Sequence, residues 1–202
     1  LVLATLFRRE ETHASAAYVA TLAVERLRQF NRRSLDHIAA KTYFYFSLAY
    51  ERIGRMDQIR AVLMACFQTA AFHRDEMSQI VLLNALVRNY FEYDLVEQAQ
   101  VLTDKTRCNG TDPAASVSHN QYCRYVYYVG RSCAIQLEYS RAYQSLLMAL
   151  RKAPQDHAFG FMKTVTKLLV LVQLLMGGIP ERSVFNCSGH VPVANALKPY
   201  LY

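Results

Sequence analysis

AIQLEYSRAYQSLLMALRKAP, residues 134–154, is the stretch that decides the fold class of this chain. Its apolar side chains recur at the spacing that places them on one face of an α-helix. They are Leu137, Ala142, Leu146, Ala149 and Leu150. Pro154 ends the helix, because proline lacks a backbone donor and its ring clashes with the preceding turn. The pattern predicts the closing half of a helical hairpin whose apolar face is buried.

Residues Leu137 to Ala142 have the pattern of a tetratricopeptide turn, in which a turn residue, an aromatic and a small Ala let two helices cross closely. Two further turns align with it, and each is followed five residues later by an apolar or small residue. These pairs are Gly54 with Ile59 and Asp94 with Ala99. The turns are 40 and 43 residues apart, which exceeds the period of about 34 in a strict tetratricopeptide array. The sequence therefore predicts an all-α, tetratricopeptide-like α-solenoid of antiparallel helical hairpins.

Apolar periodicity and cap residues predict about ten helices in the chain. Those with clear bounds cover residues 13–30, 35–53, 57–72, 75–93, 94–106 and 156–176, and another resumes near 119. Ser34 is predicted to cap the second helix, and Gly130 to permit close approach of two helix backbones. Segment 107–118 is predicted to be a loop. The opening LVLATLF is expected to be the middle of a helix, and a last helix is expected to begin near Val193.

Composition excludes disorder and gives little support to a β-sheet protein. Hydrophobic residues make up 52% of the chain, and 7 Gly and 5 Pro are few for 202 residues. This apolar content is enough for the core of one large helical domain or two small ones. The most apolar run, Leu168 to Met176, is much shorter than the roughly 20 residues that span a bilayer, so no membrane segment is expected.

The net charge of +7 is compatible with a nucleic acid, an anionic membrane surface or an acidic protein as partner. Acidic residues interrupt the densest basic cluster of the sequence. The cluster comprises Arg26, Arg28, Arg32 and Arg33, with Glu25 and Asp36 among them. A solvated helix end or a partner contact is favoured over a dedicated phosphate track. Farther along, Asp75 is expected to complement the dipole of the helix that it precedes.

Five Cys without paired spacing predict reduced, mostly buried thiols of an intracellular protein. The best set of candidate zinc ligands is Cys108, His119, Cys123 and Cys133. Structural zinc sites use tight paired spacings, which this set lacks. No metal site is therefore predicted, and Cys123 and Cys133 are expected to be buried as small hydrophobic residues.

Motifs of common catalytic sites are absent from the sequence, including H-E-x-x-H, G-x-S-x-G, a Walker loop and C-x-x-C. No catalytic residue, cofactor or small-molecule substrate is predicted. One group of side chains has the composition that stacks on and neutralises single-stranded RNA. It comprises Tyr122, Tyr125, Tyr127 and Tyr128 with Arg124 and Arg131. Core packing is favoured instead, because these tyrosines fall on helix faces that must contact the next hairpin.

Several longer stretches carry a resemblance to a known family. RYVYYVGRSCAIQLEYSRAYQSLLMALRKAPQ at 124–155 and GFMKTVTKLLVLVQLLMGGIPER at 160–182 resemble the PCI-domain family of the proteasome regulatory-particle lid known as the third non-ATPase subunit. The resemblance continues upstream through AFHRDEMSQIVLLNALVRNYFEYDLVEQA at 71–99 and KTYFYFSLAYERIGRMDQIRAVL at 41–63, and downstream to 197–200. It covers most of residues 38–202, whereas residues 1–37 match only in helical character.

The resemblance implies a scaffold in which an N-terminal α-solenoid leads into a winged-helix PCI module beside related lid subunits. Such a scaffold would help to hold the deubiquitinating subunit over the protease. Tetratricopeptide-like repeats are expected over residues 1–118, and the N-terminal helical portion of a PCI domain over 119–202. The family's winged helix and its C-terminal helix are expected to be missing from this sequence.

The predicted function is that of a non-catalytic structural subunit of the 19S lid of the 26S proteasome, which supports ubiquitin-dependent protein degradation. The expected partners are other lid PCI subunits and neighbouring regulatory-particle subunits, in the cytoplasm and nucleus, and not nucleic acid. The alternative is a PCI subunit of the COP9 signalosome or of translation initiation factor three, with an RNA-associated or regulatory role. Three arginines expected to be exposed near the first turn, Arg52, Arg55 and Arg60, are the candidate partner contacts.

Overall fold

The computed structural model describes residues 13–30, 32–108, 118–154 and 158–185. Within these ranges all regular structure is helical. The chain divides into two compact units, residues 1–117 and 118–202. The division falls next to the boundary expected from the sequence, and the assignment of the second unit to a PCI domain stays a prediction.

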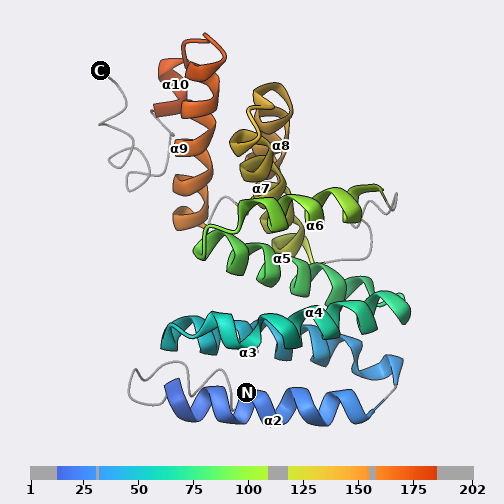
Figure 1. The fold of residues 1–202 in the computed structure, drawn as a ribbon. Coiled ribbons are helices and arrows are strands. Elements are labelled where there is room, and N and C mark those ends of the chain that lie inside the picture. The colour runs from blue at the N-terminus through green and yellow to red at the C-terminus, as the bar shows by residue number, and fades with distance from the viewer. Residues whose placement is uncertain (1–12, 31, 109–117, 155–157, 186–202) are drawn as a thin grey trace. The chain divides into compact units, whose positions relative to one another are not determined.

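The described helices of the first unit are α2 (His13–Gln29), the short 3-10 helix η2 (Arg33–Leu35), α3 (Asp36–Ile53), α4 (Met56–Phe72), α5 (Glu76–Glu92) and α6 (Val96–Cys108). Figure 1 shows α2 and α6 at opposite ends of this unit, with α3, α4 and α5 between them. Helix α3 contacts α2 as well as α4 and α5. Contacts on more than one side accommodate its aromatic side chains, which are Tyr43, Phe44, Tyr45, Phe46 and Tyr50.

Helix α5 forms the centre of the first unit. It contacts α3, α4 and α6, so most of its circumference is covered. Leu82 and Leu86 have no exposed surface, and Val87 is 1% exposed. Every residue of the run from Ile80 to Val87 is buried. A helix that is apolar all round is typical of the interior of a stack.

Five described turns share one backbone geometry. In each, a residue with positive φ follows the helix, and the next backbone N–H donates to the carbonyl five residues earlier, which is the Schellman arrangement. The positive-φ residues are Gly54, Arg74, Asp94, Leu137 and Gly177. The hydrogen bonds that close these turns measure 2.8 to 3.0 Å, and the shortest joins Leu95 N to Tyr90 O. All three turn positions that align in the sequence, at 54, 94 and 137, adopt this geometry.

The described helices of the second unit are α7 (His119–Ile135), α8 (Tyr139–Lys152), α9 (Phe159–Leu175) and the short α10 (Arg182–Phe185). Helix α8 contacts both α7 and α9. Leu146 is fully buried in α8, and an ideal Cβ built on Gly130 of α7 would lie 2.9 Å from its Cγ. The predicted close approach at Gly130 is therefore confirmed.

The apolar face predicted from residues 134–154 is confirmed in part. Ala142 and Leu146 have no exposed surface, and Ala149 is 1% exposed. Leu137 is the exception, because its side chain is 69% exposed and its φ is 66°. It forms the turn instead of the buried face, and the expectation that it packs inward is wrong.

Two helix starts also differ from the sequence predictions. Ser34 lies inside η2, and α3 begins after Leu35 without a side-chain capping hydrogen bond. Asp75 has a more specific role than a dipole effect, because its Oδ1 accepts from Ser78 N over 3.1 Å and caps α5. Helix α6 continues to Cys108, into the predicted loop. The predictions for the opening residues, for most of the 107–118 loop and for a helix near Val193 lie outside the described residues.

No helix in the described ranges has the length and apolar character needed to cross a bilayer.

Candidate partner-binding surfaces

The candidate contacts predicted from the sequence separate into two kinds in the structure. Arg52 lies in the last turn of α3, Arg55 follows Gly54, and both are exposed. Arg60 lies one turn inside α4 and is only half-exposed. The expectation that all three guanidinium groups face solvent is therefore wrong for Arg60, and the role of Arg52 and Arg55 as partner contacts stays a prediction.

Arg60 links α4 to α5. Its Nε donates to Oδ1 of Asn89 over 2.9 Å. Its guanidinium carbon lies 5.5 Å from the ring centroid of Tyr90 and 5.1 Å from that of Tyr93. These distances are within the range of cation–π attraction. The sequence showed an arginine near a turn, but its contacts with α5, about one repeat away in the chain, could not be read from local periodicity.

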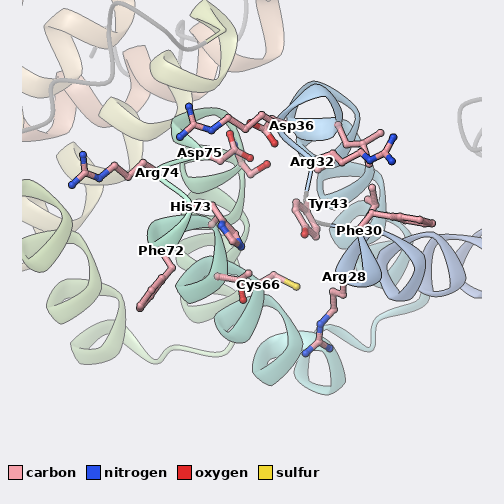
Figure 2. A pocket seen from close by; sticks show the side chains of 17 residues that line it. Arg28, Phe30, Arg32, Asp36, Tyr43, Cys66, Phe72, His73, Arg74 and Asp75 are labelled. Atoms are coloured by element: carbon pink, nitrogen blue, oxygen red, sulfur yellow. The ribbon is translucent and has the colours of Figure 1, made fainter.

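A second surface lies between the α2–α3 connection and the α4–α5 turn. It is a groove of about 790 Å³, and we call it the arginine groove after four of its lining residues. These are Arg28, Arg32, Arg33 and Arg74. Figure 2 shows Phe72 and Arg74 on one side, Arg28, Phe30 and Arg32 on the other, and Tyr43 and His73 between them.

Local backbone structure places these side chains at the groove. Arg32 has an extended backbone, with φ −132° and ψ 122°, and directly precedes η2, whereas Arg28 lies in the last turn of α2 and Arg33 is the first residue of η2. On the opposite side Arg74 has φ 54°, and Asp75 N donates to Ala70 O over 3.0 Å to close the turn. This tight turn presents Phe72, His73 and Arg74 at the end of α4.

Both positively and negatively charged side chains line the groove, and the positively charged ones are more numerous. Asp36 and Asp75 line it together with the four arginines. Burial and then the negative charge of Asp75 raise the pKa of Asp36, and Arg33 opposes this shift. The carboxylate of Asp75 is occupied by the cap of α5. The groove therefore offers several guanidinium groups beside two carboxylates, one of which already accepts a hydrogen bond from the backbone of α5.

The thiol of Cys66 and the imidazole of His73 also line this groove, and these are the two groups that form a nucleophile and its base in some catalytic sites. Burial raises the pKa of Cys66, and its 3% exposed side chain is consistent with a protonated thiol. Burial, followed by the neighbouring Cys66, also raises the pKa of Tyr43. Reactive cysteines require the opposite, a lowered pKa and solvent access. The surroundings of Cys66 therefore do not activate it as a nucleophile.

The tyrosines of α7 are used in packing within the second unit. Tyr122 is 7% exposed, its hydroxyl lies 3.7 Å from Met148 Sδ, and Lys152 Nζ lies 4.4 Å from its ring centroid. Tyr127 contacts Phe161 of α9 edge to face, with 5.7 Å between ring centroids. These contacts agree with the core-packing interpretation for two of the four tyrosines, Tyr122 and Tyr127.

The cysteines of α7 are buried thiols. Cys123 is 2% exposed and Cys133 5% exposed, and Cys123 Sγ lies 3.1 Å from the carbonyl oxygen of Lys152. In the part of the chain that the structure describes, no group of three or more His, Cys, Asp or Glu side chains could hold a metal ion. The side chain of Cys108, another of the candidate ligands, lies outside the described residues.

The sequence indicates each of the two segments that line the arginine groove, but it does not indicate that these segments lie next to each other. The basic cluster around Arg28, Arg32 and Arg33 and the short segment His73 to Asp75 each stand out in the sequence. They are separated by about forty residues, so nothing local indicates that they line one surface. The signal that connects them is the repeat itself, because a stack of antiparallel helices brings every second inter-helix connection to the same edge.

Comparison with known proteins identifies related chains. Residues 1–202 match the family model described as PSMD3-like, N-terminal TPR repeats. The 26S proteasome non-ATPase regulatory subunit 3 homolog A of Arabidopsis thaliana is 42% identical over 191 residues, 95% of this chain and 37% of the relative. The corresponding subunit 3 of Dictyostelium discoideum is 41% identical over 193 residues, 96% of this chain and 37% of the relative.

A probable subunit 3 of Drosophila melanogaster is 46% identical over 159 residues, which cover 79% of this chain and 31% of the relative. The chain thus spans 31% to 37% of the length of these three relatives. The family model describes tetratricopeptide repeats, and the described regular structure is helical with repeated Schellman turns, so the predicted all-α, tetratricopeptide-like solenoid is confirmed. The chain belongs to the PSMD3-like family, in the region of its N-terminal TPR repeats.

Proposed function

We propose that this chain is a non-catalytic scaffold segment of a subunit of the lid of the 26S proteasome regulatory particle. The observation that supports the proposal most strongly is the match of all 202 residues to the PSMD3-like family model. Three relatives in distant organisms carry the name of 26S proteasome non-ATPase regulatory subunit 3. The scaffold contributes to ubiquitin-dependent protein degradation by holding other subunits in place.

In the proposed mechanism, a rigid stack of helices presents a surface on which other subunits dock. Stacked helices bury a continuous core, and their outer faces and turns stay available to other proteins. The partners are neighbouring lid subunits with PCI domains and other regulatory-particle subunits, in the cytoplasm and nucleus. No catalytic residue, cofactor or metal takes part, because the chain contributes position and not chemistry.

Affinity purification of the tagged chain, followed by mass spectrometry of co-eluting proteins, tests this function. Recovery of lid subunits and proteasome ATPases, unchanged by RNase treatment, is the expected result. Recovery of signalosome subunits or of translation initiation factors would overturn it in favour of the alternative PCI assemblies. Recovery that disappears after RNase treatment would show association through RNA.

The exposed arginines of the first turn give a second, local test. Reversal of two charges in the variant Arg52→Glu with Arg55→Glu should reduce recovery of lid subunits, because both side chains are exposed beside the α3–α4 turn. The variant Lys105→Glu with Lys163→Glu makes the same change of net charge at exposed positions elsewhere. Equal recovery from both variants and the unchanged chain would contradict a contact at this turn.

A further inference from the structure

We infer that the arginine groove docks an acidic peptide segment of a partner protein that also carries a large apolar side chain. The inference rests on the proposed scaffold function and adds to it the chemistry of one partner contact. The observations that support it are three features of this groove: four guanidinium groups, two exposed phenylalanines and a buried hydroxyl.

The first step is the charge of the groove. Arg28, Arg32, Arg33 and Arg74 line it against only two carboxylates, Asp36 and Asp75. Ion pairs between described residues join Arg88 to Glu51 and Arg141 to Glu138, so none of them uses an arginine of the groove. Guanidinium groups bind carboxylates with two parallel hydrogen bonds, which makes arginine clusters suited to acidic segments.

The second step is the pair of exposed aromatic rings beside these charges. Phe72 is 91% exposed and Phe30 is 56% exposed. Figure 2 places them on opposite sides of the groove. Single exposed apolar residues are common on protein surfaces, but two phenylalanines beside an arginine cluster resemble the apolar anchors and polar rim of a docking site. Both rings point away from Tyr43 and His73 in Figure 2, so an occupant covers this aromatic surface where its apolar side chain extends over a rim of the groove.

The third step concerns the wall of the groove. Ser78 lines it with 1% of its surface exposed, and its Oγ has no hydrogen-bond partner among the described residues. Buried hydroxyl groups normally have partners. A peptide backbone carbonyl or a carboxylate that reaches this side of the groove would supply an acceptor.

The acidic residues of the groove distinguish a peptide from a nucleic acid. A phosphate backbone carries a regular row of negative charges and is bound by a continuous basic track. Asp36 and Asp75 interrupt such a track in the middle of the arginines, as Figure 2 shows for their labelled side chains. A peptide can place its acidic residues at the arginines and neutral residues at the carboxylates, so it fits this alternating pattern better.

Fluorescence anisotropy tests the inference with the purified 202-residue chain and a defined probe. The probe is a short fluorescein-labelled peptide of Asp and Glu residues around two Phe. We expect saturable binding that weakens as salt is added, and weaker binding of a peptide in which Ser replaces both Phe. A peptide with Lys in place of the acidic residues should not bind.

Matched variants locate the binding on the chain. The variant Arg32→Glu with Arg74→Glu should weaken binding at least about tenfold, because reversal at two rim positions both removes attraction and adds repulsion. The variant Lys105→Glu with Lys163→Glu, which has the same change of net charge outside the groove, should change it less than about twofold. Phe72→Ser should weaken binding without lowering the midpoint of thermal unfolding, since this side chain is exposed.

Four outcomes overturn the inference. Equal loss in the two charge-reversal variants would show nonspecific attraction, and unchanged binding in the groove variant would place the peptide elsewhere. Displacement of the peptide by single-stranded RNA at lower concentration than by unlabelled peptide would assign the groove to nucleic acid. If the chain is recovered with proteasome subunits but does not bind the probe, the docking inference alone fails. If it binds the probe but is never recovered with them, the scaffold function fails.

Discussion

The side-chain amide of Asn89 donates through Nδ2 to the backbone oxygen of Met56 over 2.6 Å, although Asn89 has no exposed surface. Its Oδ1 accepts from Arg60 Nε, so both ends of the amide are satisfied by the start of α4. Nearby, the Tyr93 hydroxyl accepts from Asp57 N over 3.2 Å. A buried polar side chain of this kind determines how the last turns of α5 lie against the first turn of α4.

Replacement of Asn89 by alanine should lower the free energy of unfolding by about 2–4 kcal/mol, because it leaves the Met56 carbonyl and the Arg60 guanidinium without their buried partner. Urea unfolding followed by circular dichroism measures the change. The exposed Asn120 supplies a control, and Asn120→Ala should change stability by less than about 0.5 kcal/mol. A loss below about 1 kcal/mol for Asn89→Ala would show that water replaces the lost hydrogen bonds.

The turn at Leu137 should be improved by glycine. Leu137 has φ 66° and a 69% exposed side chain, so Leu137→Gly relieves an unfavourable backbone conformation and loses little burial. We expect a gain of about 0.5–1 kcal/mol in unfolding free energy, partly offset by the greater freedom of glycine in the unfolded chain. The reverse change, Gly54→Ala at φ 74°, should cost about 1 kcal/mol.

Thermal and urea unfolding of these turn variants would be compared with Ser140→Gly, an exposed position in the first turn of α8. Glycine there should be destabilising by about 0.5–1 kcal/mol, since the backbone is helical. A loss of stability in Leu137→Gly as large as in Ser140→Gly would mean that the leucine side chain has a stabilising contact that outweighs its backbone conformation.

The turns and the contacts between helices differ in how far sequence alone can predict them. Gly54, Asp94 and Leu137 could be aligned because a turn and the small or apolar residue after it are local features. The inward direction expected for Leu137 was wrong, because periodicity alone does not tell whether a residue at a helix end belongs to the buried face or to the turn. The complete burial of α5 and the contacts of Arg60 depend on which helices lie next to each other. Such contacts join residues far apart in the chain, so spacing does not reveal them.

The crossing of α7 and α8 depends on the missing side chain of Gly130. A Cβ there would lie 2.9 Å from Leu146 Cγ and 3.1 Å from Leu146 Cδ2, which is too close without movement. Gly130→Ala should therefore cost about 1–3 kcal/mol through overpacking, despite the better helix propensity of alanine. Gly160 in the first turn of α9 is the matched control, because nothing lies within 4 Å of a Cβ there. Gly160→Ala should stabilise by about 0.4–1 kcal/mol.

A double-mutant cycle identifies the atoms responsible for the Gly130 effect. Leu146→Ala alone should cost about 2–5 kcal/mol because the side chain is fully buried. In the double variant the alanine at 130 has lost its close neighbour, so the two losses should not add and the coupling should be about 1 kcal/mol or more. Additive losses, measured by urea unfolding, would place the cost of Gly130→Ala outside this contact.

Stability should fall as the pH rises into the alkaline range. Burial raises the pKa of Cys66 and of Cys123 above the ordinary thiol value of 9.0, so the unfolded chain loses these protons at lower pH than the folded chain does. Above the unfolded pKa the folded state thus holds more protons, and the unfolding free energy decreases as the pH rises toward the folded pKa. Each thiol contributes a slope of at most about 1.4 kcal/mol per pH unit. Urea unfolding at a series of pH values between about 7 and 10 measures this dependence. Cys66→Ala should make the decline shallower, and a variant with the same slope as the unchanged chain would assign the alkaline loss to other groups.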